Sequence, residues 1–259
     1  MIIRKGPDDL AKMRRAGRVV AETLAIIREQ LRPGMTTGEL DAVAEREIRK
    51  RGAIPSFKGY GGGGSRPPFP GTICTSLNDE IVHGIPGGRR IEQGDVVKID
   101  CGAIVEGFHG DSAITVPVGD PDPTVAKLIE ATERALWAGI GEVRIGNRIG
   151  DVGSAVQTIA EGAGFSVVRE YVGHGIGRSL HEDPPVPNHG KQGKGLPLEE
   201  GLVLAIEPMV NIGSFETKLL ADEWTVVTAD GSLSAHFEHT IAVTPEGPEV
   251  LTALNGSGA

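Results

Sequence analysis

The feature that most constrains how this 259-residue chain can fold is a repeat with a period of 112 positions. Glycines recur at this offset in the two halves of the sequence, and the apolar residue at position 40 is matched by another at position 152. Long-period self-similarity is typical of duplicated structural units. The matched glycines are Gly34 with Gly146, Gly38 with Gly150, and Gly52 with Gly164.

Each half begins with a pair of candidate helices. Apolar residues recur at helical spacing over 8–31, and a second helix is expected from Thr37, as its N-cap, to Gly52. The segments 124–143 and 148–163 repeat this pattern in the same order.

Three polar positions in the strand-like segments also repeat. "EQGDVVKID" resembles "EEGLVLAIE", "GDSAITV" resembles "FEHTIAV", and "VHGIP" resembles "GHGIG", all in the same order. The polar residues matched in this way are Asp100 with Glu207, Asp111 with Glu238, and His83 with His174.

The repeat predicts an α/β (α+β) chain with two related halves, at about 8–118 and 124–245. Neither half has an obvious linker or a core of its own, so we expect one domain over 1–259 in which both halves pack their sheets together with the helices outside.

Composition limits the partners and the compartment. The formal net charge of −9 argues against a nucleic-acid-binding surface. The N-terminus lacks an apolar stretch of signal-peptide length, and no apolar run is long enough to span a membrane. Two cysteines, Cys74 and Cys101, do not make a disulfide framework, so we expect a reducing, cytoplasmic setting.

Two aspartates are predicted to lie on one face of a hairpin. A Glu-Gly turn at 106–107 separates two β-rich runs. If the residues flanking this turn pair with each other, Asp100 faces Ala113 and lies diagonal to Asp111. A shift of one residue in register would separate the two aspartates.

These aspartates, with Glu207 and Glu238, end or begin strongly apolar strands. Buried carboxylates must be paired, protonated or bound to a cation. The sequence places only Lys98 conveniently near them. Two divalent cations would balance four carboxylates, and a neutral imidazole would complete the set. Such mixed ligands suit Mn, Fe, Co or Zn.

The stretch "YVGHGIGRSLHEDP" at 171–184 has two interpretations: a glycine-rich phosphate loop, or a segment that holds two imidazoles. A dinucleotide fingerprint requires glycines that open a helix. Here the glycines alternate and no helix is expected to follow, which favours the second interpretation.

Taken together, "VHGIP", "IDCGAIVEGFHGDSA", "GHGIGRSLHEDP", "IEPMV" and "HFEHTIAVT" resemble the motifs of type I methionine aminopeptidases, of metallopeptidase family M24. The resemblance runs from the first helix to about residue 252. It implies the pita-bread fold, a pseudo-two-fold structure with helices outside a curved antiparallel sheet. Each half then contributes to a site for two divalent ions, of Co, Mn, Fe or Zn.

The resemblance also assigns the residues of the site. Asp111 and Glu238 would bridge the ions, and Glu207 would be the general base and acid when metal-activated water attacks the first peptide bond. His83 and His181 would contact the substrate as catalytic groups. The implied metal ligands are Asp100, Asp111, His174, Glu207 and Glu238.

The implied activity is removal of the initiator methionine from nascent proteins whose second residue is small. The chain departs from the family pattern at a longer loop, "GGGGSRP" at 61–67, and at His236, where glutamine is common. Phe69 and Leu180 stand where bacterial members often have tyrosine and phenylalanine. The implied methionine pocket comprises Tyr60, Phe69, Cys74, Leu180 and Trp224.

The resemblance favours a monomer that meets nascent polypeptides, with transient ribosome association as a possible further contact. Two alternatives are a non-catalytic binding protein of the same fold and an X-Pro peptidase or creatinase-like enzyme. The complete ligand set argues against the first, and the expected lack of a preceding domain argues against the second.

Overall fold

The computed structural model describes residues 2–61 and 66–254. Four helices and fifteen strands lie within these residues. In chain order they are α1 (Pro7–Gln30), α2 (Thr37–Lys50), β1 (Ile54–Pro55), β2 (Ile73–Leu77), β3 (Glu80–Val82), β4 (Val96–Val105), β5 (Phe108–Pro117), α3 (Pro123–Gly141), α4 (Ile149–Gly162), β6 (Ser166–Val167), β7 (Gly173–Gly175), β8 (Glu182–Val186), β9 (Val203–Ile206), β10 (Met209–Asn211), β11 (Thr217–Leu219), β12 (Val226–Thr228), β13 (Ser234–His236), β14 (His239–Thr244) and β15 (Gly247–Val250).

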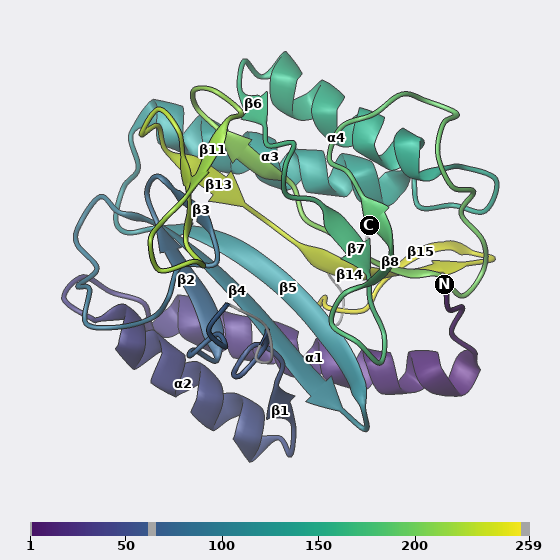
Figure 1. Ribbon diagram of the computed structural model, residues 1–259, viewed down its shortest axis with the longest axis horizontal. Coiled ribbons are helices and arrows are strands. Elements are labelled where there is room, and N and C mark those ends of the chain that lie inside the picture. The colour runs from purple at the N-terminus through teal and green to yellow at the C-terminus, as the bar shows by residue number, and fades with distance from the viewer. Residues whose placement is uncertain (1, 62–65, 255–259) are drawn as a thin grey trace.

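The helices form two outer pairs with the strands between them. In Figure 1, α1 and α2 run along one side of the long β4–β5 hairpin, and α3 and α4 cover the opposite side of the molecule. The apolar stripe of α1 is fully or almost fully buried at Met13, Val20, Leu24 and Ile27, as helical periodicity predicts.

The duplication is visible in the backbone. Helices α2 and α4 have the same length, fourteen residues, and begin 112 positions apart, at Thr37 and Ile149. Strands β1 and β6 follow them at the same offset. The glycines after these helices, Gly52 and Gly164, have φ values of +73° and +89°, a region that favours glycine. The predicted fold class, two duplicated halves with helices outside antiparallel strands, is confirmed.

One boundary prediction is wrong by one residue. The N-cap of α2 is Thr36 and not Thr37. The Thr36 hydroxyl accepts from Glu39 N at 3.1 Å, and the Glu39 carboxylate accepts from Thr36 N at 2.6 Å, which makes a capping box. Thr37 is the first helical residue, and its hydroxyl bonds instead to the backbone of Gly87.

Every strand pair is antiparallel, and the ladders divide into four sheets. In the first half, β4 pairs with β5 over ten residues. In the second half, β9 pairs with both β7 and β14. A bridge between Ala113 and Glu238 joins the halves, with Glu238 N donating to Ala113 O at 3.0 Å.

The two largest groups of buried apolar side chains lie one in each half. One joins α1 and α2 to β2 and β4, and includes Leu24, Ile48 and Ile99. The other lies against α3 and α4 and includes Leu136 and Ile206. Among the described helices, none is long and apolar enough to cross a membrane.

Candidate metal centre

The β4–β5 hairpin positions the two aspartates. Its turn residues, Glu106 and Gly107, have φ values of +50° and +78°, as a tight turn of this kind requires. The register pairs Asp100 with Ala113 and Gly102 with Asp111. The predicted turn and register are confirmed, and both aspartates line the same cavity.

Three separate short elements position the candidate ligands of the second half. His174 is the middle residue of β7, Glu207 directly follows β9, and Glu238 directly precedes β14. Because β9 lies between β7 and β14, the three side chains come together at one place in the sheet.

The glycines around His174 allow the chain to pass close to neighbouring backbone. A Cβ at Gly173 would lie 2.3 Å from Ala205 O, and a Cβ at Gly175 would lie 2.2 Å from Asp183 O. No helix follows this segment before β8. The glycines therefore give room for the backbone, and the phosphate-loop interpretation is not supported.

The five predicted ligands lie around one cavity of about 260 Å³. Ligand atoms of Asp111, His174 and Glu238 lie within 4.8 Å of one another, a spacing that one metal ion could bridge. Glu207 lies beside them, with Oε1 3.7 Å from His174 Nε2. Asp100 completes the lining on the side of β4.

The carboxylates of this cluster lack the partners that buried charge requires. Oδ1 of Asp100, Oδ1 of Asp111 and Oε1 of Glu238 are buried and have no hydrogen-bond partner among the described residues. Unpaired buried oxygens of this kind cost free energy unless a proton or a cation joins them. The donor set, four carboxylates and one imidazole, therefore fits divalent metal ions of the first transition row.

The pKa values of the same groups reflect the missing positive charge. Burial raises the pKa of Asp100 to about 7 and that of Glu207 to about 8. Burial and then the neighbouring carboxylates raise the pKa of Asp111 and Glu238 well above their usual values. Burial lowers the pKa of His174 to about 3, which keeps the imidazole neutral and able to bind a metal.

The two histidines predicted to contact the substrate line the same cavity. His181 lines the cavity, its ring centroid lies 4.3 Å from that of His174, and its Nδ1 lies 2.6 Å from the Tyr60 hydroxyl. His83 also lines the cavity and has a left-handed backbone, with φ of +59°. Its Nδ1 is buried without a hydrogen-bond partner.

The structure also brings together the five residues predicted for the methionine pocket. Cys74, Leu180 and Trp224 are almost fully buried and line the cavity beside Tyr60 and Phe69. Phe69 meets Trp224 edge to face, with ring centroids 5.1 Å apart. Of the predicted longer loop, positions 62–65 lie outside the described residues.

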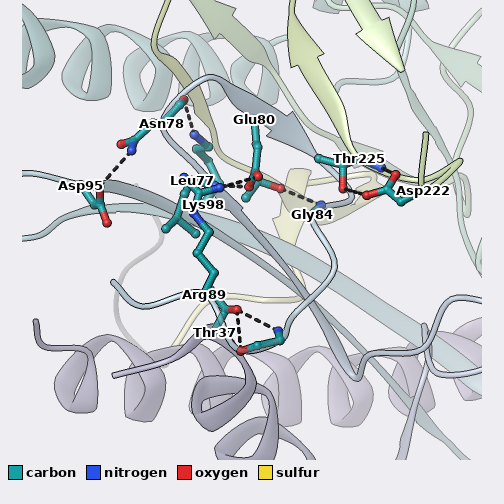
Figure 2. Close-up of polar contacts among 12 residues, drawn as sticks. Thr37, Leu77, Asn78, Glu80, Gly84, Arg89, Asp95, Lys98, Asp222 and Thr225 are labelled. Carbon is teal, nitrogen blue, oxygen red and sulfur yellow. Dashed lines mark hydrogen bonds and ion pairs between the residues drawn. The ribbon is translucent and has the colours of Figure 1, made fainter. Parts of the chain in front are cut away.

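Lys98, the one basic residue expected near the aspartates, is engaged elsewhere. Its ammonium donates to the backbone oxygen of Asn78 at 2.7 Å (Figure 2). The Asn78 side chain donates to Asp95, and Glu80 accepts from Leu77 N (Figure 2). These bonds hold the turn that leads to His83, so Lys98 supports the cavity wall and does not neutralise the carboxylates.

Neighbouring residues that could have been mistaken for ligands point elsewhere. His109 Nδ1 is 2.9 Å from the Ser56 hydroxyl, and Cys101 is packed in the apolar core. His239 lies against Trp137, with ring centroids 5.4 Å apart, on the other side of the sheet from Glu238. Both cysteines are free thiols.

Two polar residues of the site were not singled out as functional from the sequence. His236 is buried, neither ring nitrogen has a hydrogen-bond partner, and Nε2 lies 3.6 Å from Glu207 Oε2. In the sequence, the only indication of a role for His236 was that histidine replaces the glutamine common at this position in the family. Arg66 also lines the cavity. In the sequence, the only indication of a role for Arg66 was its position within the longer loop.

Comparisons with known proteins agree with this geometry. The sequence model of metallopeptidase family M24 matches residues 11–245. A methionine aminopeptidase of Bacillus subtilis is 54% identical over 254 residues, which cover 98% of this chain and all of that protein. A methionine aminopeptidase structure from Rickettsia prowazekii has a TM-score of 0.94 and 43% identity, and the match covers 98% of this chain and all of that one.

A more distant match shows the fold alone. A prolidase from Pyrococcus furiosus has a TM-score of 0.77 at 21% identity, and the match covers 98% of this chain but 66% of that one. The same architecture therefore occurs in a peptidase whose sequence has diverged widely.

Proposed function

The chain belongs to metallopeptidase family M24 and, within it, to the methionine aminopeptidases, and from this membership we propose that it removes the initiator methionine from proteins whose second residue is small. The observation that carries the proposal is the buried group of four carboxylates and one imidazole beside an apolar pocket.

We propose that the site holds two divalent ions, of Mn, Fe, Co or Zn. Asp111 and Glu238 would bind both ions, Asp100 would complete the shell of one, and His174 and Glu207 that of the other. The charges support two ions, because two divalent cations balance four ionised carboxylates. When bound, such ions polarise a peptide carbonyl and lower the pKa of a bound water.

Glu207 is the proposed general base and acid. Its high pKa without a cation shows how strongly burial favours a proton on this carboxyl. It would take a proton from the attacking water and pass it to the leaving amine. Asn188 Nδ2 donates to the Glu207 backbone oxygen at 3.0 Å, which fixes this segment beside the cavity.

His181 and His83 are proposed to bind the peptide at the reacting bond. When the Tyr60 hydroxyl donates to His181 Nδ1, Nε2 carries the ring proton and is left as a donor for the substrate carbonyl. Such a donor acts best where negative charge develops in the transition state. His83 has an unpartnered buried nitrogen and so retains hydrogen-bonding capacity for substrate.

The cavity fits one side chain and a peptide bond. Its volume of about 260 Å³ lies just below the roughly 300–1,000 Å³ typical of small-molecule pockets. Apolar groups of Phe69, Cys74, Leu180 and Trp224 line it, which supports binding of a methionine side chain. The α-amino group would lie at the metal site, which limits cleavage to one residue.

The proposal extends to the setting of the reaction. An enzyme that acts on initiator methionine works on chains during or soon after their synthesis. On that ground we propose a cytoplasmic monomer, in a single catalytic domain, that meets nascent chains through transient contact with the ribosome.

The test uses the purified full-length protein, stripped with a chelator and reloaded separately with Mn, Fe, Co or Zn. We expect cleavage of Met-Ala-Ser and none of X-Pro peptides. Cleavage of X-Pro peptides alone would contradict the proposal and assign the chain to the other peptidases of this fold. Metal binding without cleavage of any peptide would instead indicate a binding protein.

A further inference from the structure

Arg66 is held flat against the wall of the methionine pocket. Its guanidinium carbon lies 3.5 Å from the centroid of the Trp224 ring. Trp224 Nε1 donates to the backbone oxygen of Pro67 at 3.0 Å. The guanidinium is therefore fixed by a stacked contact and by the anchored residue that follows it.

The positive charge of Arg66 has no partner among the described residues. Its Nε is buried without a hydrogen bond, and no ion pair forms between its guanidinium and a described carboxylate. A guanidinium stacked on a ring keeps its in-plane N–H donors free. An unpaired donor at a cavity wall is available to a ligand.

The acidic residue on the turn that carries Trp224, Asp222, does not form an ion pair with Arg66. Asp222 accepts a hydrogen bond from Trp224 N at 2.9 Å. It also accepts from Thr225 N at 2.8 Å, and its second oxygen accepts from the Thr225 hydroxyl (Figure 2). Both carboxylate oxygens are thus used to shape the turn that carries Trp224, and Asp222 forms no ion pair with Arg66.

The charge of Arg66 acts on the reaction site itself. Burial and then the positive charge of Arg66 lower the pKa of His83 to about 3. The same cavity is lined by Arg66, His83 and His181. A substrate held between the two histidines would lie within the field of this guanidinium.

We propose that Arg66 is a specificity-determining residue that binds a carboxylate of the peptide substrate beyond the scissile bond. This inference rests on the proposed aminopeptidase function. The methionine side chain would occupy the apolar pocket, and a small second residue offers no carboxylate, so the third residue is the first that can supply one. A planar guanidinium recognises a carboxylate through two parallel hydrogen bonds. The favoured substrates carry aspartate or glutamate at the third position.

The test compares two amidated peptides, Met-Ala-Glu-Ser-NH2 and Met-Ala-Gln-Ser-NH2, which differ only in the charge at the third residue. For the metal-loaded wild-type protein, we expect kcat/KM to be about two- to fivefold higher for the glutamate peptide, the range of a partly exposed charge pair. The free acid and the amide of Met-Ala-Ser are compared as well, because a terminal carboxylate offers the same chemistry from another source.

Variants of Arg66 separate charge from packing. In Arg66→Gln the ratio between the glutamate and glutamine peptides should fall to about one, whereas Arg66→Lys should retain part of it. Arg169→Gln is the matched control, because Arg169 also stacks on an aromatic ring, that of Phe215 at 4.2 Å, but does not line the cavity. This control should keep the wild-type ratio.

The inference fails if the wild-type protein does not prefer the glutamate peptide, or if Arg66→Gln keeps the preference. A preference for the free acid of Met-Ala-Ser alone would restrict the role of Arg66 to terminal carboxylates and overturn the assignment to the third side chain. Failure of the proposed function is distinct, since the glutamine peptide would then not be cleaved at all.

Discussion

The two halves of the molecule use the same order of elements to position ligands in different ways. The first half places Asp100 and Asp111 on one continuous hairpin of two ten-residue strands. The second half places His174, Glu207 and Glu238 on or beside three strands of three to six residues. The comparison indicates that the first half positions its ligands on one local hairpin, whereas the second brings its ligands together by pairing three strands from separate parts of the chain.

Equivalent positions in the two halves also have different environments. His83 and His174 occupy matching motifs, yet His174 lies within the carboxylate cluster, and His83 lies at the cavity wall within the influence of Arg66. The two halves therefore share an architecture, and the different surroundings of the matched histidines agree with the proposed roles, a ligand at His174 and a substrate contact at His83.

The largest expected effect comes from removing one proposed bridging ligand from either half. Asp111→Asn and Glu238→Gln should each lower kcat by more than about a hundredfold, because losing a ligand costs more than losing a residue that only supports one. Peptide turnover and metal content are measured together. A variant in one half that keeps more than a tenth of wild-type turnover would show that the halves do not share the site equally.

The matched histidines give the next largest contrast. His174→Ala should lose metal as well as turnover, whereas His83→Ala should keep its metal and lose turnover. His181→Ala, which has no counterpart in the repeat, should behave like His83→Ala. The metal content of each variant after dialysis distinguishes a metal ligand from a histidine that only contacts the substrate. Loss of metal from His181→Ala would contradict the proposed role of His181 as a substrate contact.

A moderate effect is expected on the stability of the metal-free protein. The pKa of Asp100 and that of Glu207 are raised in the folded state, to about 7 and about 8. For these two carboxyls the folded state binds more protons than the unfolded state from about pH 4 upwards. Above about pH 7 the buried histidines, whose pKa values are lowered, are neutral in both states, so the carboxyls decide the sign and stability falls as the pH rises. We expect the melting temperature of the stripped protein to fall by several degrees between pH 7 and pH 9.

Reloading with metal is the control for this pH effect. Bound cations replace the protons, so the metal-induced gain in melting temperature should be larger at pH 8 than at pH 5. An equal gain in melting temperature at pH 5 and pH 8 would show that the metal does not stabilise the protein by replacing protons on the carboxylates.

The smallest expected effect tests the duplication itself. Gly52 and Gly164 both have positive φ, and a Cβ at either would meet no atom within 4 Å. Replacing each by alanine should lower the free energy of unfolding by about 1–2 kcal/mol, the cost of a left-handed backbone for a residue with a Cβ. Chemical denaturation measures the free energy of unfolding of both variants. Losses that differ by more than about 1 kcal/mol would show that the two glycine positions are not equivalent.

The parts that the sequence predicted well were local. The register of Asp100 and Asp111 follows from a tight turn between consecutive strands, so counting from the turn was sufficient. The start of α2 was misplaced by one residue because two adjacent threonines both suit an N-cap, and only the bonds to Glu39 and Gly87 distinguish them.

The parts that could not be predicted depend on contacts between distant segments. Arg66 contacts Trp224, which lies 158 positions later in the chain. Lys98 donates to the Asn78 backbone although its strand parity is that of Asp100. Strand parity gives the face of a sheet on which a side chain lies, but not the partner that a long side chain reaches. The roles of the five proposed ligands likewise remain predictions that need a bound metal.

The most direct test of the shared metal centre is anomalous X-ray diffraction from crystals of the full-length protein loaded with Mn²⁺. The account predicts two anomalous peaks that both contact Asp111 and Glu238, one of them beside Asp100 and the other beside His174 and Glu207. Absence of a peak in this cavity, or peaks contacted by residues of only one half, would contradict a metal centre built jointly by both halves.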